Sequence, residues 1–413
     1  MKIAIVGSGI SGLAAAHQLQ DSGEVVIFEA DSRIGGHTDT HSILVGGNTY
    51  AVDSGFIIFN RDNYPHFSAW LDDLGVSSQP TNMSFGVRNA DTGLEYGTAG
   101  LKALFCQRRR VLSPRFLGML RDLRRFYRDA QSFEIDEATT LGELVRQQGY
   151  GQGFLQDHLA PMCAALWSLP LRNVEDLPAL HILAFMAHHK LLQLHGRPEW
   201  RVVQGGSSRY VDAFAGAFRG EIRSSDPVSA IGRGPGGATI RSRSGEHHFD
   251  SVVIACHSDQ ALDLLVDPST AEREILGAIP YQSNQAVVHS DSRVMPDNRA
   301  AWSSWNGLVN SAAEQSCQVS YWMNQLQGLP DDKDFFVTLN PPEQLDEVWS
   351  TRNYSHPMFT PQARAAQRRR HEINGVNNTY YCGAYWRWGF HEDGFTSARD
   401  VALLMQEQLA HAA

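Results

Sequence analysis

Three glycines and one acid near the start of the chain form the pattern with the most chemical meaning. Gly7, Gly9 and Gly12 make a GxGxxG between an apolar run and a stretch of helical composition. In such a strand–turn–helix the first glycine permits a tight turn, the second lets a pyrophosphate approach the helix N-terminus, and the third lets the helix pack closely. Glu29 ends the next apolar run, at the position where a carboxylate can bind a ribose 2′-hydroxyl. The pattern predicts a dinucleotide site and leaves NAD and FAD both open.

The segment after Glu29 favours FAD. It resembles the ExxxRxGG signature of flavin amine oxidases, phytoene desaturases and protoporphyrinogen oxidases, with Arg33, Gly35 and Gly36 at the matching positions. In that superfamily the glycine pair lies beside the dinucleotide. The loop Asp53–Gly55 is similar to the one that runs near the flavin ring there. The resemblance implies a flavin-dinucleotide cofactor.

The end of the chain carries the matching second half of such a site. Tyr381–Ala384 and Gly389–Ala398 resemble the superfamily's closing motif, in which a helix N-terminus points at the flavin N1/O2 edge and favours negative charge there. Asp226–Val228 and Val252–Cys256 resemble the strands beside the adenine. The residues predicted to bind FAD are Gly7, Gly9, Ile10, Ser11, Gly12, Glu29, Ala30, Arg33, Gly35, Gly36, His37, Thr38, Asp53, Gly55, Phe56, Val228, Cys256, Gly383, Glu392, Asp393, Gly394 and Phe395.

Several departures separate this chain from true amine oxidases. Where those enzymes carry an arginine after the glycine pair, this sequence has His37 and Thr38. They also carry a lysine beside flavin N5, and the residue aligned with it here is Gln285. The cysteine that binds flavin covalently in monoamine oxidases has no counterpart, because Cys382 falls inside the glycine motif. The resemblance therefore implies non-covalent FAD and weakens amine oxidation as the activity.

A more particular resemblance rests on Gly36–Thr38, Ile254–Leu262, Gly383–Tyr385 and Gly389–Gly394. These segments resemble a bacterial flavoprotein family associated with cyclopropane-fatty-acid-type lipid methylation. That family is similar to the flavin domain fused ahead of plant cyclopropane fatty acid synthases. The resemblance implies a substrate related to modified acyl chains and a methyltransferase as a partner.

Flavin oxidation requires a C–H bond held over N5 in a dry pocket and an acceptor for the released proton. His289, Tyr354 and His356 are the predicted catalytic residues, since a histidine titrates near working pH. No second GxGxxG follows a strand, which argues against bound NAD(P)H. Aromatic candidates for the pocket wall are Trp302, Trp305, Tyr321, Trp322, Tyr385, Trp386 and Trp388.

These features predict an FAD-dependent oxidoreductase of oxidase or desaturase type, with hydride transfer to flavin N5 and an apolar, acyl-lipid substrate. Three alternatives stay open. The first is a redox-neutral isomerase of unsaturated fatty acyl chains, the second an amine oxidase, and the third a non-catalytic flavoprotein partner of a lipid methyltransferase.

Residues 102–128 carry a net positive charge, whereas the chain as a whole has a net charge of −10. Apolar residues interleave with the charges at roughly helical spacing, and a basic amphipathic helix can lie on an anionic membrane. A solvated helix packed on its own domain is the alternative. The negative total argues against a general nucleic-acid partner. The charged residues between Leu101 and Ala130 are Lys102, Arg108, Arg109, Arg110, Arg115, Arg121, Arg124, Arg125 and Arg128 against Asp122 and Asp129.

The elements that must position these residues are interleaved along the chain. Apolar runs predict strands over Lys2–Val6 and Ser251–Ala255, and a glycine-rich turn at Gly232–Gly237 predicts a hairpin. Residues 80–200 are predicted to be mostly helical. The expected fold is α/β (α+β overall). A Rossmann-like FAD-binding domain would comprise 1–78, 200–272 and 372–413, and a mixed substrate domain 79–199 and 273–371.

The composition of the chain narrows the class of protein further. The 42% apolar and 19% charged residues are ordinary for a globular protein. The five cysteines are scattered without metal-ligand spacing, so we predict reduced thiols and no metal. We expect no signal peptide and no membrane span. The expected location is cytoplasmic, with peripheral contact at the inner membrane face.

Overall fold

A five-stranded parallel sheet gathers the two ends and the middle of the chain. The computed structural model describes residues 1–136, 138–167, 171–193, 196–310, 317–341 and 344–412. All neighbouring strands of this sheet run parallel, and its central apolar strands are buried, as a parallel sheet covered on both faces requires. Its strands in spatial order are β10 (Glu221–Arg223), β2 (Glu24–Phe28), β1 (Lys2–Val6), β14 (Ser251–Ile254) and β20 (Thr379–Tyr381).

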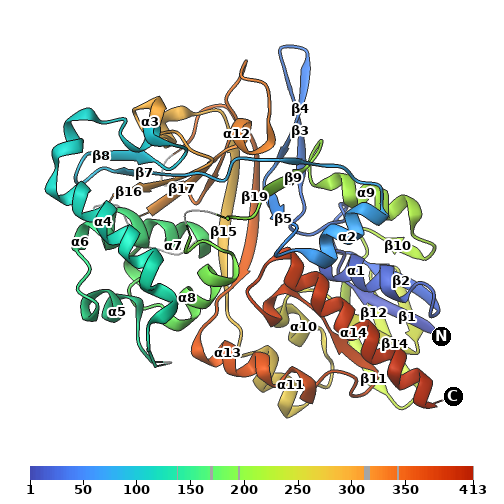
Figure 1. The fold of residues 1–413 in the computed structure, drawn as a ribbon. Helices are drawn as coiled ribbons and strands as arrows, with labels where there is room; N and C mark the ends of the chain where they lie inside the picture. The colour runs from blue at the N-terminus through green and yellow to red at the C-terminus, as the bar shows by residue number, and fades with distance from the viewer. Residues whose placement is uncertain (137, 168–170, 194–195, 311–316, 342–343, 413) are drawn as a thin grey trace.

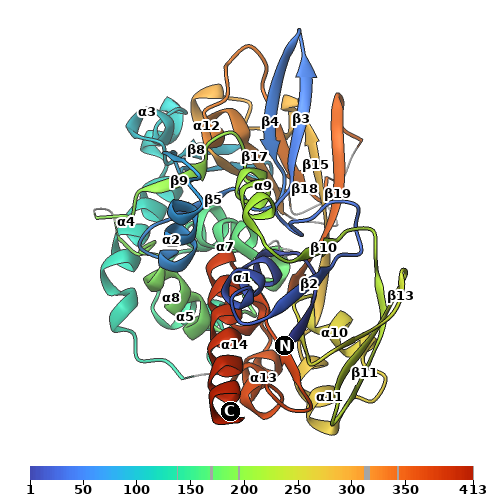
Figure 2. The same ribbon diagram turned by 90° about the vertical axis from the view of Figure 1, so that its right-hand side faces the viewer.

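Two helices that lie far apart in sequence cover one face of this sheet. Helix α1 (Ile10–Leu19) packs beside α14 (His391–Ala412), as Figure 2 shows. The opposite face packs against a three-stranded antiparallel sheet, β11 (Val228–Gly234), β12 (Gly237–Ser242) and β13 (Gly245–Phe249). Gly234 pairs with Gly237 at the tip of β11 and β12, which confirms the predicted hairpin.

A seven-stranded mixed sheet forms the second layer. Figure 1 shows its long strands β15 and β19 running toward the first sheet. Strands β7 and β8 are an exception in the segment predicted to be mostly helical. Their strand state depends on tertiary pairing, because β7 pairs with β16, which comes from a distant part of the chain. In spatial order the strands are β19 (Val348–Pro357), β15 (Tyr281–His289), β18 (Phe336–Leu339), β17 (Cys317–Trp322), β16 (Trp305–Val309), β7 (Phe85–Asn89) and β8 (Leu94–Gly97).

Helices pack on one side of this sheet around a core rich in phenylalanine and leucine. These helices are α4 (Pro114–Asp129), α5 (Leu141–Gln147), α6 (Gln152–Phe154), α7 (Ala160–Trp167) and α8 (Ala179–His188). Two small sheets complete the fold, β3 (Thr40–Val45) with β4 (Asn48–Asp53), and β5 (Ile58–Asn60) with β9 (Trp200–Val203) and β6 (Ser78–Pro80). The remaining helices are α2 (Pro65–Asp73), α3 (Leu101–Leu104), α9 (Ser208–Ala217), α10 (Ser258–Leu264), α11 (Thr270–Leu276), α12 (Met323–Gln327) and α13 (Pro361–Arg368).

The mixed α/β architecture agrees with the prediction from sequence. Within the described ranges, no helix combines the length and apolar composition needed to cross a bilayer.

Candidate functional site

The glycine-rich turn connects β1 to the N-terminus of α1. A side chain at Gly12 would place its Cβ 1.9 Å from Gly7 O, so this glycine is required by the packing of helix on turn. Gly9 differs, because no atom lies within 4 Å of the position where its Cβ would be. The first bond of α1 runs from Leu13 N to Gly9 O. The N–H groups ahead of it have no acceptor within the helix. The turn at Gly9 therefore has N–H donors without acceptors in the helix, and open space beside them.

Glu29 lies at the edge of this turn, directly after β2. Its Oε2 accepts hydrogen bonds from Ser8 N (2.9 Å) and Ser8 Oγ (2.6 Å), and its Oε1 accepts one from Asp31 N (2.9 Å). Ala30 beside it is exposed. Each carboxylate oxygen can accept about two hydrogen bonds, so Oε1 retains capacity for a ribose hydroxyl. Ser8, which the sequence did not single out, orients the acid.

The glycine pair crosses over the turn. Gly36 has φ +57°, and a Cβ there would come within 3.0 Å of Gly9 Cα. The guanidinium of Arg33 donates to Thr38 O at 2.6 Å and Gly36 O at 2.8 Å. Arg33 therefore holds the backbone of this segment, and its donors are directed at the protein. Gly35 is fixed in turn by hydrogen bonds from its N–H to Ser8.

The first turn of α14 abuts the first turn of α1. A Cβ on Gly394 would lie 2.8 Å from both Ile10 Cγ2 and Ser11 Oγ. Gly383, at the end of β20, donates its N–H to Ser397 Oγ (3.2 Å). Two helix N-termini thus converge on one spot, and both bring positive dipole ends and N–H donors suited to an anion.

Acidic side chains of α14 are already engaged with the protein. Glu392 accepts hydrogen bonds from the backbone N–H groups of His66 (3.1 Å) and Phe67 (3.0 Å), so it caps α2. Asp393 accepts from Phe390 N (2.9 Å), and burial raises its pKa to about 6. Both were predicted to bind FAD, but their carboxylates support neighbouring backbone. Phe395 is buried in the core below them.

Asp53 is the centre of a buried hydrogen-bond network. Its carboxylate accepts from Ser207 N (2.9 Å), Ser207 Oγ (2.9 Å), Gln327 Nε2 (2.9 Å) and Thr40 Oγ1 (2.5 Å). Burial raises its pKa to about 7 despite these donors. Asp53 was predicted to bind the cofactor, and its oxygens instead join three distant chain segments. Neither Ser207 nor Gln327 carried a sequence signal.

The residues that follow Asp53 meet the two cofactor motifs. A Cβ on Gly55 would lie 1.9 Å from His37 O, so only glycine fits there. The ring of Phe56 stacks on His391, with 3.6 Å between ring centroids. His391 Nε2 also lies within hydrogen-bond distance of Thr38 Oγ1 (3.1 Å) and Tyr210 OH (2.9 Å). The first and last motifs of the chain are therefore in direct contact.

Val228 and Cys256, predicted at the adenine end, pack against the same apolar cluster on the β11–β13 side of the parallel sheet. Burial raises the pKa of the Cys256 thiol to about 12. Both residues lie at strand ends, with Cys256 just beyond β14 and Val228 at the start of β11.

Two of the three predicted catalytic residues lie beside the glycine pair. The ring of Tyr354 stacks on His37 at 4.9 Å, and His356 lies 5.5 Å from His37. His257, not predicted as a site residue, is 5.7 Å from His37. Tyr354 OH is within hydrogen-bond distance of Ser54 Oγ (2.9 Å). Burial, reinforced by His257, lowers the pKa of His356 to about 4, so its ring is neutral at pH 7.

His289 lies apart from this group, which corrects the prediction. It ends β15, at the opposite end of the strand from Tyr281, whose ring stacks on His257 at 4.6 Å. At about 3.3 Å per residue, β15 separates the two by roughly 26 Å. The ring is fully buried, accepts from Asp291 N (3.0 Å) and bonds Thr338 Oγ1 (2.7 Å). His289 is a satisfied core histidine.

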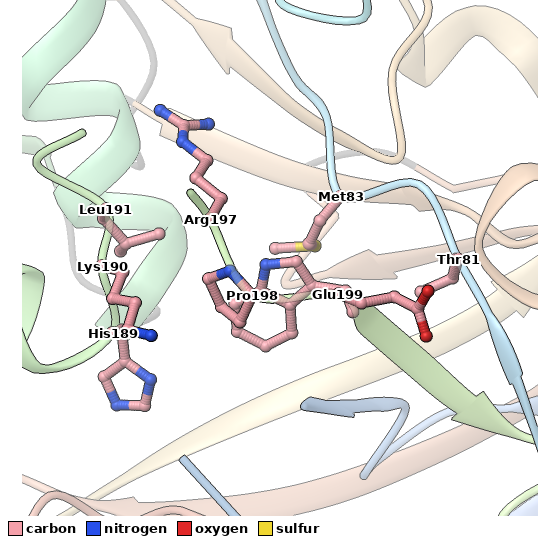
Figure 3. Close-up of a pocket in the computed structure, with 9 residues that line it drawn as sticks. Thr81, Met83, His189, Lys190, Leu191, Arg197, Pro198 and Glu199 are labelled. Atoms are coloured by element: carbon pink, nitrogen blue, oxygen red, sulfur yellow. The ribbon is translucent and has the colours of Figure 1, made fainter. Parts of the chain in front are cut away.

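The structure also contains a pocket of about 190 Å³, whose lining residues are drawn in Figure 3. His189, in its wall, lies 5.4 Å from the ring of Phe390, which directly precedes α14. The neighbouring His188 packs on Trp388 at 4.8 Å. The pocket therefore borders the loop that leads into the α14 N-terminus. Its lining residues are Thr81, Met83, His189, Lys190, Leu191, Arg197, Pro198, Glu199 and Trp200.

The geometry fits FAD at the turn, where Gly9 leaves space, two helix N-termini supply donors, and Glu29 stands at the ribose position of the motif. A family model described as flavin containing amine oxidoreductase matches residues 10–328. The chain belongs to this family. Its cofactor is FAD, and its homologues are FAD-dependent oxidoreductases.

Individual relatives are distant. An L-amino-acid oxidase of Siganus canaliculatus is 26% identical over 69% of this chain, which spans only 56% of that protein. Cyclohexylamine oxidase from Brevibacterium oxydans shares the fold, with a TM-score of 0.69, 16% identity and 99% coverage of both chains. A CLA-producing fatty acid isomerase from P. acnes shares it too, with a TM-score of 0.67, 15% identity and 97% coverage of both.

We predict that this flavoprotein releases its FAD on denaturation. The thiol of Cys382 is fully buried and directed at Ser11 O (3.8 Å), and burial raises its pKa, so it is a poor nucleophile for a flavin bond. Acid precipitation of the yellow protein should leave FAD in the supernatant. Flavin retained in the pellet would show a covalent link, and FMN in the supernatant would contradict the dinucleotide site.

Proposed function

We propose that the chain is an FAD-dependent oxidoreductase that oxidises an apolar substrate of the acyl-lipid class. The observation that carries the proposal is the pocket beside the loop into α14. Met83, Leu191 and Pro198 give it apolar walls, and Arg197 adds a cation suited to a carboxylate. Two other charged residues of the lining are already paired, Lys190 with Asp62 and Glu199 with Arg201. A chain with an acidic head group matches this combination, because apolar walls bury methylenes and a cation pairs with the head group.

The absence of a suitable lysine argues against amine oxidation. Neither β15 nor β19 contains a lysine. Three of the four lysines are in ion pairs elsewhere, Lys2 with Glu24, Lys190 with Asp62 and Lys333 with Glu347, and Lys102 is exposed on α3. The amino-acid oxidase among the relatives keeps amine oxidation as the alternative to be tested.

Tyr354 and His356 are the residues proposed to handle the proton. FAD, when bound, supplies the hydride acceptor. The neutral ring of His356 can take up a proton, and its Nδ1 lies 2.9 Å from the side-chain amide of Asn284, which orients it. Because the pKa of His356 is about 4, the acceptor is available above that pH and is lost as the pH falls through it.

Anaerobic mixing with candidate substrates tests the proposal. We expect oleic or linoleic acid to bleach the flavin absorbance, and His356→Gln to slow bleaching by about 10²- to 10⁴-fold, the usual contribution of a general base. His371→Gln is the matched control, because this exposed histidine lies outside the site. FAD content should be equal in all three proteins.

Other outcomes identify other functions. Bleaching by amines or amino acids alone would make the chain an amine oxidase. Fatty-acid product formed without net bleaching would make it an isomerase, an activity named for one of its structural neighbours. No response to any of these compounds would favour a non-catalytic partner of a lipid methyltransferase.

A further inference from the structure

The apolar face of α4, which the sequence predicted could contact a membrane, is buried inside the protein. Phe116, Met119 and Phe126 are each no more than 2% exposed and pack in the core of the helical layer. These residues recur at the spacing of one helix face. The predicted amphipathic helix is therefore present, but its apolar side is covered by its own domain and cannot enter a bilayer.

The opposite side of α4 is a cationic stripe. Leu117, Arg121, Arg124 and Arg128 follow at intervals of four, three and four residues, which places them on one face. All four are exposed, with the side chains of Arg121 and Arg128 at 75% and 73%. The stripe is about 16 Å long at 1.5 Å per residue. Figure 1 shows α4 on the side of the molecule away from both chain termini.

The 3-10 helix before α4 extends this surface and adds an exposed leucine. Arg108 and Arg109 are exposed on a 3-10 helix over Arg108–Leu112, which contacts α4. Leu112 is 84% exposed and Leu101 75%, the two most exposed large apolar side chains of the described residues. The basic face consists of Arg108, Arg109, Leu112, Leu117, Arg121, Arg124 and Arg128.

Acidic groups pair with two of the three arginines in the α4 stripe, Arg121 and Arg128. Asp122 pairs with Arg121 (3.1 Å) but is 1% exposed, and Asp129 pairs with Arg128 (2.6 Å). Within the described ranges, no ion pair is formed by Arg108, Arg109 or Arg124. The basic face therefore has a local positive potential, although the chain as a whole has a net charge of −10.

We propose that the basic face docks the protein on an anionic lipid bilayer. Arginine and lysine near a membrane surface are attracted by acidic head groups, and exposed leucines among them can enter the boundary of head groups and acyl chains. A nucleic acid would use the cations but would leave the leucines exposed to water. The inference rests on this surface and does not depend on the substrate proposed above.

Vesicle flotation of the FAD-loaded protein tests the docking. We expect binding to phosphatidylcholine vesicles that contain one third phosphatidylglycerol, and none to pure phosphatidylcholine. Salt should weaken binding, since the screening length falls to about 3 Å at 1 M. The triple change Arg121→Gln, Arg124→Gln and Arg128→Gln should weaken it on the order of 100-fold. Arg125 is left out because its guanidinium lies 3.9 Å over the ring of Tyr150.

A matched control carries the same change of charge elsewhere. Arg61, Arg219 and Arg241 are 52%, 63% and 66% exposed on other parts of the surface, and their joint replacement by Gln should leave binding within about twofold of wild type.

Replacing an exposed leucine distinguishes a bilayer from other anionic partners. Leu112→Gln should weaken vesicle binding about 10-fold while leaving the salt dependence unchanged. FAD content and melting temperature report that each variant is folded. The proposal is overturned if wild type ignores anionic vesicles, or if the basic-face triple variant binds them as well as wild type. It is also overturned if Leu112→Gln has no effect while heparin competes fully, which would assign the face to a polyanion.

Discussion

Replacing Gly9 with valine is expected to abolish FAD binding while leaving the apoprotein folded. The backbone of Gly9 has φ −66°, which any residue can adopt, and no atom lies within 4 Å of its Cβ position. Valine therefore fits the turn without a clash, but its side chain occupies the space through which a pyrophosphate must approach. Loss of two charge-assisted hydrogen bonds, at about 1.5–3 kcal/mol each, predicts an affinity at least about 100-fold lower. Titration of apoprotein with FAD measures this directly.

Two companion variants make the result specific. Gly12→Ala should destabilise the apoprotein itself by about 1–3 kcal/mol, because its Cβ would lie 1.9 Å from Gly7 O. Glu29→Ala removes one charge-assisted bond to the ribose, so FAD affinity should fall by about 10- to 150-fold. If Gly9→Val binds FAD as tightly as wild type, the turn does not hold the pyrophosphate.

Glu272→Ala is expected to cause a large loss of stability, about 3 kcal/mol or more in the free energy of unfolding. The side chains of Glu272 and Arg233 are 4% and 1% exposed and form an ion pair. Glu272 Oε1 also accepts from Tyr381 OH (2.5 Å), in the strand that leads to Gly383. Removing one partner of a buried pair leaves an uncompensated charge, which typically costs about 3–5 kcal/mol. Urea unfolding of the FAD-loaded protein measures the effect.

Asp267→Ala is the control for this ion pair. Asp267 contacts the same guanidinium at 3.3 Å but is 55% exposed, so its removal should cost less than about 1 kcal/mol. Equal losses in the two variants would contradict the assignment of the buried pair.

The same pair predicts a pH dependence. Burial alone would raise the pKa of Glu272, but hydrogen bonds from Arg233 and Tyr381 outweigh it and hold the pKa at about 2, below the ordinary 4.5. A carboxyl whose pKa is lower in the folded state stabilises above its unfolded pKa. The advantage of wild type over Glu272→Ala should therefore be full above about pH 5 and shrink as the pH falls toward 2.

The sequence by itself determined the dinucleotide site and the strand–turn–helix that forms it. Gly9, Gly12 and Glu29 lie close together in the chain, and each is required by local geometry: open space, a close backbone contact and a strand end. Local backbone constraints of this kind require particular residues at fixed intervals in the sequence, and such intervals can be recognised. The parallel sheet and the closing helix could be predicted for the same reason, because apolar runs and helix starts are local patterns.

Only the tertiary structure decided which side chains act together. Asp53 is bound by Ser207 and Gln327, and His37 meets His356, although these partners are far apart in the sequence. The structure likewise separated His289 from these groups. No periodicity records such contacts, since they depend on how the sheets and helices pack. The orientation of α4 likewise depends on tertiary packing. Its sequence pattern predicted an apolar face and a basic face, and only the packing shows that the apolar face is buried and the basic face is exposed.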